Sequence, residues 1–456
     1  MTHGLLHTQV RRSMLVLGLV LTLLAGCEES KYPASLRYPQ RADLLVKDPP
    51  STDFRKPMPG PGQLDESIRK AARENIFQSV DPAEVGKAER DELRTALEEL
   101  FGTPAQPSVE PADPERMSGS KKATAQENQK LYQEALGTNL QSFDVAETDV
   151  DQLFIDSESL TRETGSRSRT LARGSQLYRR HCLHCHGVAG DGRGPTGPWV
   201  SPHPRDYRQG TFKFLSTNLQ VVGTGKPRKD DLLRTLEKGL DGTSMPAFGL
   251  LPRRELEQMV SYVIHLSIRG QVEYDTLYAL VKNRPAIDEK GGVKGFAYNQ
   301  AAVLTAQWAL ASKLEMNKPP AYPHGDDTEK DKVEASIRRG HQLFLGKGLC
   351  ITCHLDYGRQ SANRYDTWGT MVRPRNLTEG NYRGGRRPID LFWRLSGGIP
   401  PSGMSKLPPT TTPEEAWDLI NFVQALPYPA MLPRDVRDKI YGPAEAKKPS
   451  VAQANP

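Results

Sequence analysis

Four of the five cysteines in the 456-residue chain lie in two copies of one short pattern, and each copy is followed at once by a histidine. The copies are Cys182-Leu-His-Cys185-His186 and Cys350-Ile-Thr-Cys353-His354. The pattern C-x-x-C-H is typical of covalent attachment of a c-type haem. On a helical turn, positions i, i+3 and i+4 share one face, so two thiols can add to the two vinyl groups of one haem while the histidine reaches its iron. The sequence therefore predicts two covalently bound haem c groups.

Other uses of these cysteines fit their spacing poorly. A zinc ribbon has its two C-x-x-C pairs about 15–20 residues apart, whereas 164 residues separate Cys185 from Cys350. Two local disulfides are compatible with an oxidising compartment, but they give no reason for the histidine after each pair. A thioredoxin-like motif belongs to a βαβ unit, and the neighbouring sequence shows no such pattern.

The residues around the two motifs repeat as well. Gly174 and Tyr178 precede the first motif, and Gly340 and Phe344 precede the second, which carries two extra residues before Cys350. Downstream, each copy predicts a short amphipathic helix that ends at glycine, a loop with methionine fourteen residues after an aspartate, and a further helix. These segments are 231–245 and 255–266 in the first copy, and 390–404 and 415–426 in the second.

This order of elements resembles class I cytochrome c, the mitochondrial type, in both copies. The resemblance implies a small all-α fold around each haem. It implies His186 and Met245 as axial ligands of the first iron, and His354 and Met404 as axial ligands of the second.

The resemblance also implies how each domain is held together. Its last helix should cross its first helix at a contact between glycine and an aromatic ring, namely Gly174 with Tyr262 and Gly340 with Phe422. In such domains the loop after the motif offers a backbone carbonyl that orients the ligand histidine and an arginine near a haem propionate. The recurring pairs Pro204-Arg205 and Pro374-Arg375 are the candidates for these two roles.

Other methionines and histidines are weaker ligand candidates. Met259 falls on the apolar face of a predicted helix, and methionine is more often a gap-filler in a core than a ligand. Met371 follows His354 by only 17 residues, too few to pass around a haem. His203 and His265 remain alternative ligands in the first domain. Two further histidines are expected at the surface or in packing: His184 and His341.

The N-terminus predicts export and a lipid anchor. Arg11 and Arg12 precede a short apolar run, and Leu24-Ala25-Gly26-Cys27 resembles the lipobox of bacterial lipoproteins. We therefore expect a signal peptide at residues 1–26, lipid attachment at Cys27 and a membrane-anchored protein in the periplasm. An ordinary secretory signal that happens to meet a cysteine is the alternative.

The remaining segments are expected to be tether, linker and tail. The predicted divisions are a tether or docking segment at 27–166, cytochrome c domains at 167–270 and 334–430, a linker at 271–333, and a tail at 431–456. Single helices are expected at Arg90–Phe101 and around Ala301–Leu314. Net charge is −10 over residues 27–160 and +14 from residue 161 onward. Nucleic acid is not an expected partner of this basic part, because the chain is exported and carries no nucleic-acid motif.

The sequence thus predicts a membrane-anchored di-haem c-type cytochrome that carries single electrons between extracytoplasmic redox proteins. A quinol-oxidising complex and a terminal oxidase are the suggested partners. Six basic residues near Met404 could steer an acidic partner: Arg373, Arg375, Arg383, Arg386, Arg387 and Lys406. No catalytic residue is predicted. The alternatives are a di-haem enzyme, such as a peroxidase or thiosulfate-type dehydrogenase, and an electron-transfer subunit of a larger oxidase or dehydrogenase.

Overall fold

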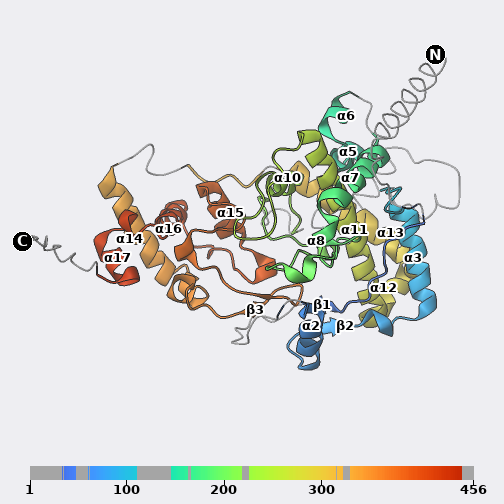
Figure 1. Ribbon diagram of the computed structural model, residues 1–456, viewed down its shortest axis with the longest axis horizontal. Coiled ribbons are helices and arrows are strands. Elements are labelled where there is room, and N and C mark those ends of the chain that lie inside the picture. Colours follow the sequence, from blue (N-terminus) through green and yellow to red (C-terminus); the bar gives the residue numbers. More distant parts are fainter. Residues whose placement is uncertain are drawn as a thin grey trace, which may run out of the picture.

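A computed structural model of the chain describes residues 33, 35–47, 60, 62–109, 145–162, 166–217, 225–314, 316–321 and 329–443. These residues are mainly helical and form two lobes, each with a hydrophobic core (Figure 1). We call the described residues up to 314 the first lobe and residues 329–443 the second lobe. The predicted signal peptide and Cys27 lie outside the described residues.

Helices dominate both lobes, and short 3-10 turns join many of them. The first lobe contains β1 (Leu45–Lys47), α2 (Leu64–Arg73), β2 (Gln78–Val80), α3 (Lys87–Phe101), α5 (Glu147–Phe154), α6 (Ser157–Thr161), α7 (Arg167–His181), α8 (Leu183–His186), α10 (Lys229–Lys238), α11 (Arg253–Lys282), α12 (Arg284–Glu289) and α13 (Gly292–Lys313). The second lobe contains α14 (Lys330–Leu345), β3 (Arg364–Tyr365), β4 (Met371–Val372), α15 (Pro388–Gly397), α16 (Pro413–Ala425) and α17 (Arg434–Tyr441). Both strand pairs are antiparallel. No helix within the described ranges is long and apolar enough to cross a membrane.

The predicted helix crossings are present in both lobes. A Cβ atom on Gly174 of α7 would lie 2.2 Å from the Gln258 carbonyl oxygen and 3.0 Å from Tyr262 Cβ, both on α11. A Cβ atom on Gly340 of α14 would lie 2.8 Å from Phe422 Cβ on α16. The backbones therefore approach so closely that only glycine fits at these two crossings. The Gly–aromatic contact implied by the resemblance is confirmed.

Helix α11 continues far beyond this crossing. It runs for 30 residues, from Arg253 to Lys282. Near its middle, a Cβ atom on Gly270 would lie 2.5 Å from Arg208 Cα, in the loop that follows Arg205. One helix therefore supports both the helix before the first motif and the loop after it.

The predicted tether and linker are largely folded where the structure describes them. Helix α3 buries Leu93, Leu97 and Leu100 at helical spacing and packs against α13 and α11, while α5 packs against α13. These side chains share one core with Trp308 of α13. The expected helix at Arg90–Phe101 falls within α3, and the one around Ala301–Leu314 falls within α13 except for Leu314, which follows its last residue. Because their apolar faces bury one another, these segments form an added helical layer instead of an extended tether and linker.

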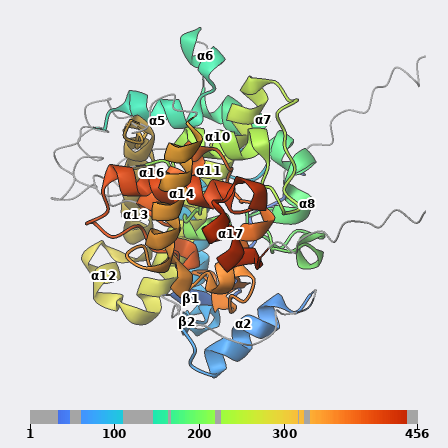
Figure 2. The ribbon, with the colours of Figure 1, turned by 90° about the vertical axis from the view of Figure 1, so that its left-hand side faces the viewer.

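The predicted tail is folded onto the second lobe where the structure describes it, because α17 buries Val436 and Ile440 in the core of that lobe. A different set of side chains joins the two lobes. A small third core brings Val46 and Phe77 of the first lobe against Met371 of the second. Figure 2 shows α2, β1 and β2 together at the lower edge of the molecule, where this core lies.

Candidate haem-attachment sites

The first motif forms a helical turn directly after α7. The backbone N–H groups of Cys185 and His186 both donate to the Cys182 carbonyl, at 3.2 and 2.9 Å, which places the three side chains on one face. Cys182 is buried and Cys185 is partly exposed, and both are free thiols. Burial raises the pKa of Cys182 to about 12. At neutral pH this thiol is therefore protonated.

His186 is held in the orientation that metal-binding histidines adopt. Its Nδ1–H donates to the Arg205 carbonyl at 3.2 Å, and Tyr207 stacks on its ring with centroids 4.7 Å apart. Burial lowers the pKa of His186 to about 4, although the hydrogen bond to Arg205 opposes this shift. The ring is therefore neutral at pH 7, and the bond at Nδ1 leaves Nε2 with a lone pair that could bind a metal.

The second motif repeats this arrangement. The His354 backbone N–H donates to the Cys350 carbonyl at 2.9 Å, and His354 Nδ1–H donates to the Arg375 carbonyl at 2.9 Å. Burial lowers the pKa of His354 as well, and burial raises the pKa of the Cys350 thiol to about 11. The Pro-Arg pairs therefore supply the expected carbonyls in both lobes.

The second lobe contains a cavity that suits a haem. Its volume is about 380 Å³, and it is lined by Cys350, Cys353, His354 and Met404. Apolar side chains complete the walls: Phe344, Leu349, Leu377, Leu391, Leu419 and Val423. Two thiols, a neutral histidine and a thioether inside one apolar cavity are the donor set of a His/Met c-type haem. The residues present therefore fit the group that the sequence predicts.

The two predicted ligand methionines lie in loops that share a hydrogen bond and a preceding glycine. The Leu240 N–H donates to the Met245 carbonyl at 3.1 Å, and the Ile399 N–H donates to the Met404 carbonyl at 2.8 Å. Each turn begins at a glycine with positive φ, +67° at Gly239 and +70° at Gly398. Met245 packs against the core of the first lobe, and Met404 lines the cavity of the second.

The weaker candidates have other surroundings. His265 is fully buried and its Nε2 bonds to the Phe101 carbonyl at 3.0 Å, so it belongs to the core. Met259 is also fully buried, and Met371 belongs to the third core. His203 lines a separate cavity, described below. Of the two histidines expected at the surface or in packing, His184 is exposed and His341 bonds to Tyr357 Oη at 2.9 Å.

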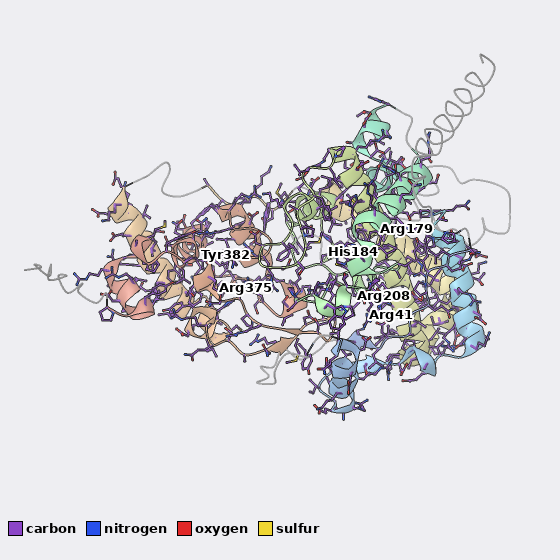
Figure 3. The ribbon with its side chains drawn as sticks, in the orientation of Figure 1. Arg41, Arg179, His184, Arg208, Arg375 and Tyr382 are labelled. Atoms are coloured by element: carbon purple, nitrogen blue, oxygen red, sulfur yellow. The ribbon has the colours of Figure 1, made fainter. Side chains whose placement is uncertain are left out.

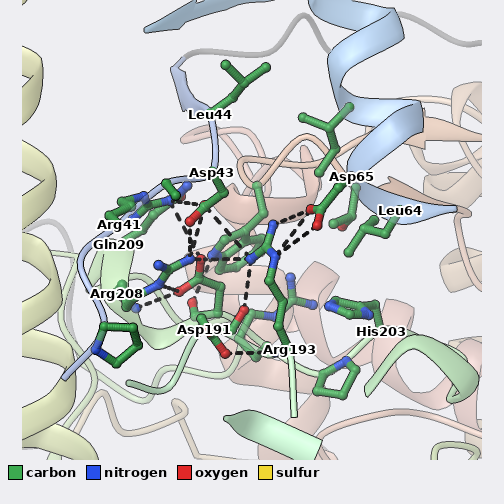
Figure 4. Close-up of a pocket in the computed structure, with 18 of the residues that line it drawn as sticks. Arg41, Asp43, Leu44, Leu64, Asp65, Asp191, Arg193, His203, Arg208 and Gln209 are labelled. Atoms are coloured by element: carbon green, nitrogen blue, oxygen red, sulfur yellow. Dashed lines mark hydrogen bonds and ion pairs between the residues drawn. The ribbon is translucent and has the colours of Figure 1, made fainter. Parts of the chain in front are cut away.

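A cluster of alternating charges supports the loop after the first motif, and sequence reasoning missed it (Figure 4). Arg208 pairs with Asp206 at 2.8 Å and with Asp43 at 2.9 Å, and Arg193 pairs with Asp65 at 2.6 Å. Burial alone would raise the pKa of Asp43, but Arg41, Arg208 and Arg193 together hold it well below its usual range. The cluster surrounds a cavity of about 330 Å³ that is also lined by His203. Arg208 and Asp206 are neighbours in the sequence, but Asp43 lies 165 residues from Arg208 and Asp65 lies 128 residues from Arg193, too far for any local pattern to pair them.

The arginines and lysine singled out in the sequence divide into those that line the second-lobe cavity and those that pair with other side chains. Arg205 pairs with Asp366 across the two lobes. Arg375, labelled in Figure 3, lines the second-lobe cavity. Arg373, Arg383 and Lys406 line the same cavity. In contrast, Arg387 pairs with Asp390 at 2.9 Å and Arg386 donates to Tyr428 Oη at 2.5 Å. Four of the six basic residues expected to meet a partner therefore line the second-lobe cavity instead.

Comparison with known proteins identifies part of the chain. Residues 169–263 match the family model described as cytochrome c oxidase, cbb3-type, subunit III, so this stretch of the first lobe is a cytochrome c domain. No curated protein matches the chain. A solved structure, the Kuenenia stuttgartiensis reducing HAO-like protein complex Kustc0457/Kustc0458, is similar at 20% sequence identity and a TM-score of 0.39. The similarity covers 56% of this chain and 95% of that one.

Proposed function

We propose that the chain is a membrane-anchored di-haem c-type cytochrome that carries single electrons between extracytoplasmic redox proteins. The observation that carries this proposal is the equivalence of the two sites. His186 and His354 each donate Nδ1–H to the carbonyl of the arginine in a Pro-Arg pair. The turns that carry the two methionines have the same hydrogen-bond pattern. The cytochrome c domain at residues 169–263 supports electron transfer as the general role.

Each lobe would hold its haem with four side chains. In the first lobe, these are the thiols of Cys182 and Cys185, with His186 and Met245 on the iron. In the second lobe they are Cys350, Cys353, His354 and Met404. The haem supplies the reversible one-electron change at its iron, and methionine ligation raises the reduction potential.

The other residues around each site position the ligands and exclude water. The Arg205 and Arg375 carbonyls fix the ring orientation of the two histidines, which would leave each Nε2 available to the metal. The apolar walls around His354 would exclude water from a haem bound there. With His354 and Met404 both on the iron, no position would be left for a substrate, which favours electron transfer over bond-making chemistry.

A second candidate function is that of an electron-transfer subunit in a larger oxidase. The match of residues 169–263 to a model of an oxidase subunit favours it. In this case the added layer of α3, α5 and α13 would contact other subunits. Purification from membranes in mild detergent distinguishes a free carrier from a subunit by what co-purifies with the chain.

Haem content and ligation test the main proposal. After expression with haem-maturation machinery, the intact mass should exceed that of the polypeptide by two haems, and acid–acetone should extract neither. The matched variants are Cys182→Ala with Cys185→Ala and Cys350→Ala with Cys353→Ala, each of which should retain one haem. A wild-type protein with one haem, or with a high-spin haem that turns over peroxide, would overturn the di-haem carrier.

A further inference from the structure

Equivalent positions of the two repeats meet where the lobes contact each other. Arg234 of α10 lies over the ring of Trp393 of α15, 4.4 Å from its centroid. These two residues occupy the same place, three residues after the aspartate of each repeat. A Cβ atom on Gly384 would lie 2.5 Å from Phe214 Cδ1, and these residues are both ten positions after the proline of a Pro-Arg pair. The lobes therefore face each other through the same surface, as two-fold related units do.

A cluster of basic side chains lies at this junction with too few acids to balance it. Arg205 Nη1 lies 3.2 Å and Lys213 Nζ lies 3.5 Å from the same oxygen of Asp366. The other Asp366 oxygen accepts hydrogen bonds from Trp368 and Thr370. The side chains of Arg205 and Lys213 are only 21% and 15% exposed, and Asp366 is fully buried. Among the described residues, Asp366 is the carboxylate that forms ion pairs with both of these largely buried cations. Asp206 also acts on Arg205 electrostatically, but it forms ion pairs with Arg208 and Arg41.

Arg383, which holds the place of Lys213 in the second repeat, adds a third cation. Its Nε atom is buried without a hydrogen-bond partner among the described residues. Burial, with repulsion from Arg375 and Arg205, lowers the pKa of Arg383 to about 10. Burial and repulsion from Arg205 likewise lower the pKa of Lys213 to about 7, although Asp366 opposes this shift. Charges buried this way are costly unless an anion compensates them.

The side chain of Lys213 also reaches the haem cavity of the other lobe. Lys213 and Phe214 come from the first lobe, yet both line the cavity that contains Cys350, His354 and Met404. Arg383 lines the same cavity. The group that suits this cavity, haem c, carries two carboxylates, which are the anions that the cluster lacks. Charge-assisted hydrogen bonds to such carboxylates would satisfy both cations.

We propose that Lys213 of the first lobe, together with Arg383 of the second, binds the carboxylates of the haem held by the second lobe. This inference rests on the proposed function, since it requires haem in the second lobe. Lys213 is a positioning residue, because it acts on the iron only through the haem carboxylates. A cation beside a haem disfavours the ferric state, which carries one more positive charge than the ferrous state. Lys213 should therefore raise the reduction potential of the second-lobe haem.

The test is a redox titration of the full-length holoprotein, with two haems resolved by absorbance. In Lys213→Met, the ratio of ferrous to ferric second-lobe haem at a fixed potential should fall about tenfold, which is 59 mV for a one-electron couple. Lys213→Arg should restore the ratio. Lys330→Met is the matched control, since that side chain is 86% exposed, and it should leave both haems unchanged. Met404→His changes one expected ligand of the second-lobe haem. The part of the titration curve that this variant shifts is therefore assigned to that haem.

The outcomes separate this inference from the proposed function. A wild-type protein without haem in the second lobe would refute the proposed function and this inference with it. The inference alone would be refuted if the protein holds two haems per chain and the ratio of ferrous to ferric second-lobe haem in Lys213→Met stays within twofold of wild type. If Lys213→Met does not fold, Arg383→Met decides in its place, and an unchanged ratio there overturns the proposal.

Discussion

Replacing Gly174 with alanine should destabilise the first lobe through the crossing of α7 and α11. The added Cβ would lie 2.2 Å from the Gln258 carbonyl oxygen, whereas ordinary contact begins at 3.4 Å. The helices must therefore move apart by about 1 Å, because a backbone oxygen cannot turn away as a side chain can. Overpacking of this kind costs up to about 3 kcal/mol, and alanine regains about 1 kcal/mol of helix propensity. The net loss is about 2 kcal/mol, or about 4–8 °C in Tm for a lobe of this size.

Thermal unfolding of the holoprotein, followed by far-ultraviolet circular dichroism and haem absorbance, measures this loss. Gly86→Ala is the control, since its Cβ would meet only Glu89 Oε2 at 3.8 Å. Gly340→Ala should lower the transition of the second lobe in the same way, because its Cβ would lie 2.0 Å from the Asp418 carbonyl oxygen. An unchanged or raised Tm in Gly174→Ala would show that the two helices do not cross as described.

Three further predictions concern a buried histidine, a ligand and the anchor. Burial lowers the pKa of His265 to about 4 from an ordinary 6.5. The unfolded chain therefore takes up a proton first, and up to about 3 kcal/mol of stability should be lost as the pH falls from 6.5 to about 4. His265→Gln should flatten this part of a urea-unfolding pH profile, and an unchanged slope would contradict the assignment. Met404→Ala should remove about half of the near-infrared charge-transfer band of the oxidised protein, and retention of the full band would exclude Met404 as a ligand. Cys27→Ala should move the protein from the membrane fraction to the soluble fraction with an unchanged visible spectrum, whereas a soluble wild type would refute the anchor.

The sequence was most informative where chemistry imposes a local spacing or where the repeat could be aligned with itself. Such patterns support the family resemblance, and the resemblance in turn implies the crossing of Gly174 with Tyr262 and the carbonyl that meets His186. Partners without a fixed spacing could not be predicted. The apolar face of α3 indicates burial but does not say that α13 covers it, and nothing local links Arg205 to Asp366, 161 residues later.

Because α11 is continuous, an insertion between Tyr262 and Gly270 would disturb the first site by changing the spacing of two contacts, which a substitution would leave unchanged. Tyr262 packs against α7 and Gly270 packs beside the loop that offers the Arg205 carbonyl, and the two residues are eight positions apart on one continuous helix. At 1.5 Å of rise per residue, this helix sets a spacing of about 12 Å between the two contacts. One inserted residue would lengthen that spacing by about 1.5 Å and turn one contact by about 100° relative to the other. This part of α11 thus fixes the distance between α7 and the loop after the first motif. In related sequences, insertions and deletions should be confined to the loops around it.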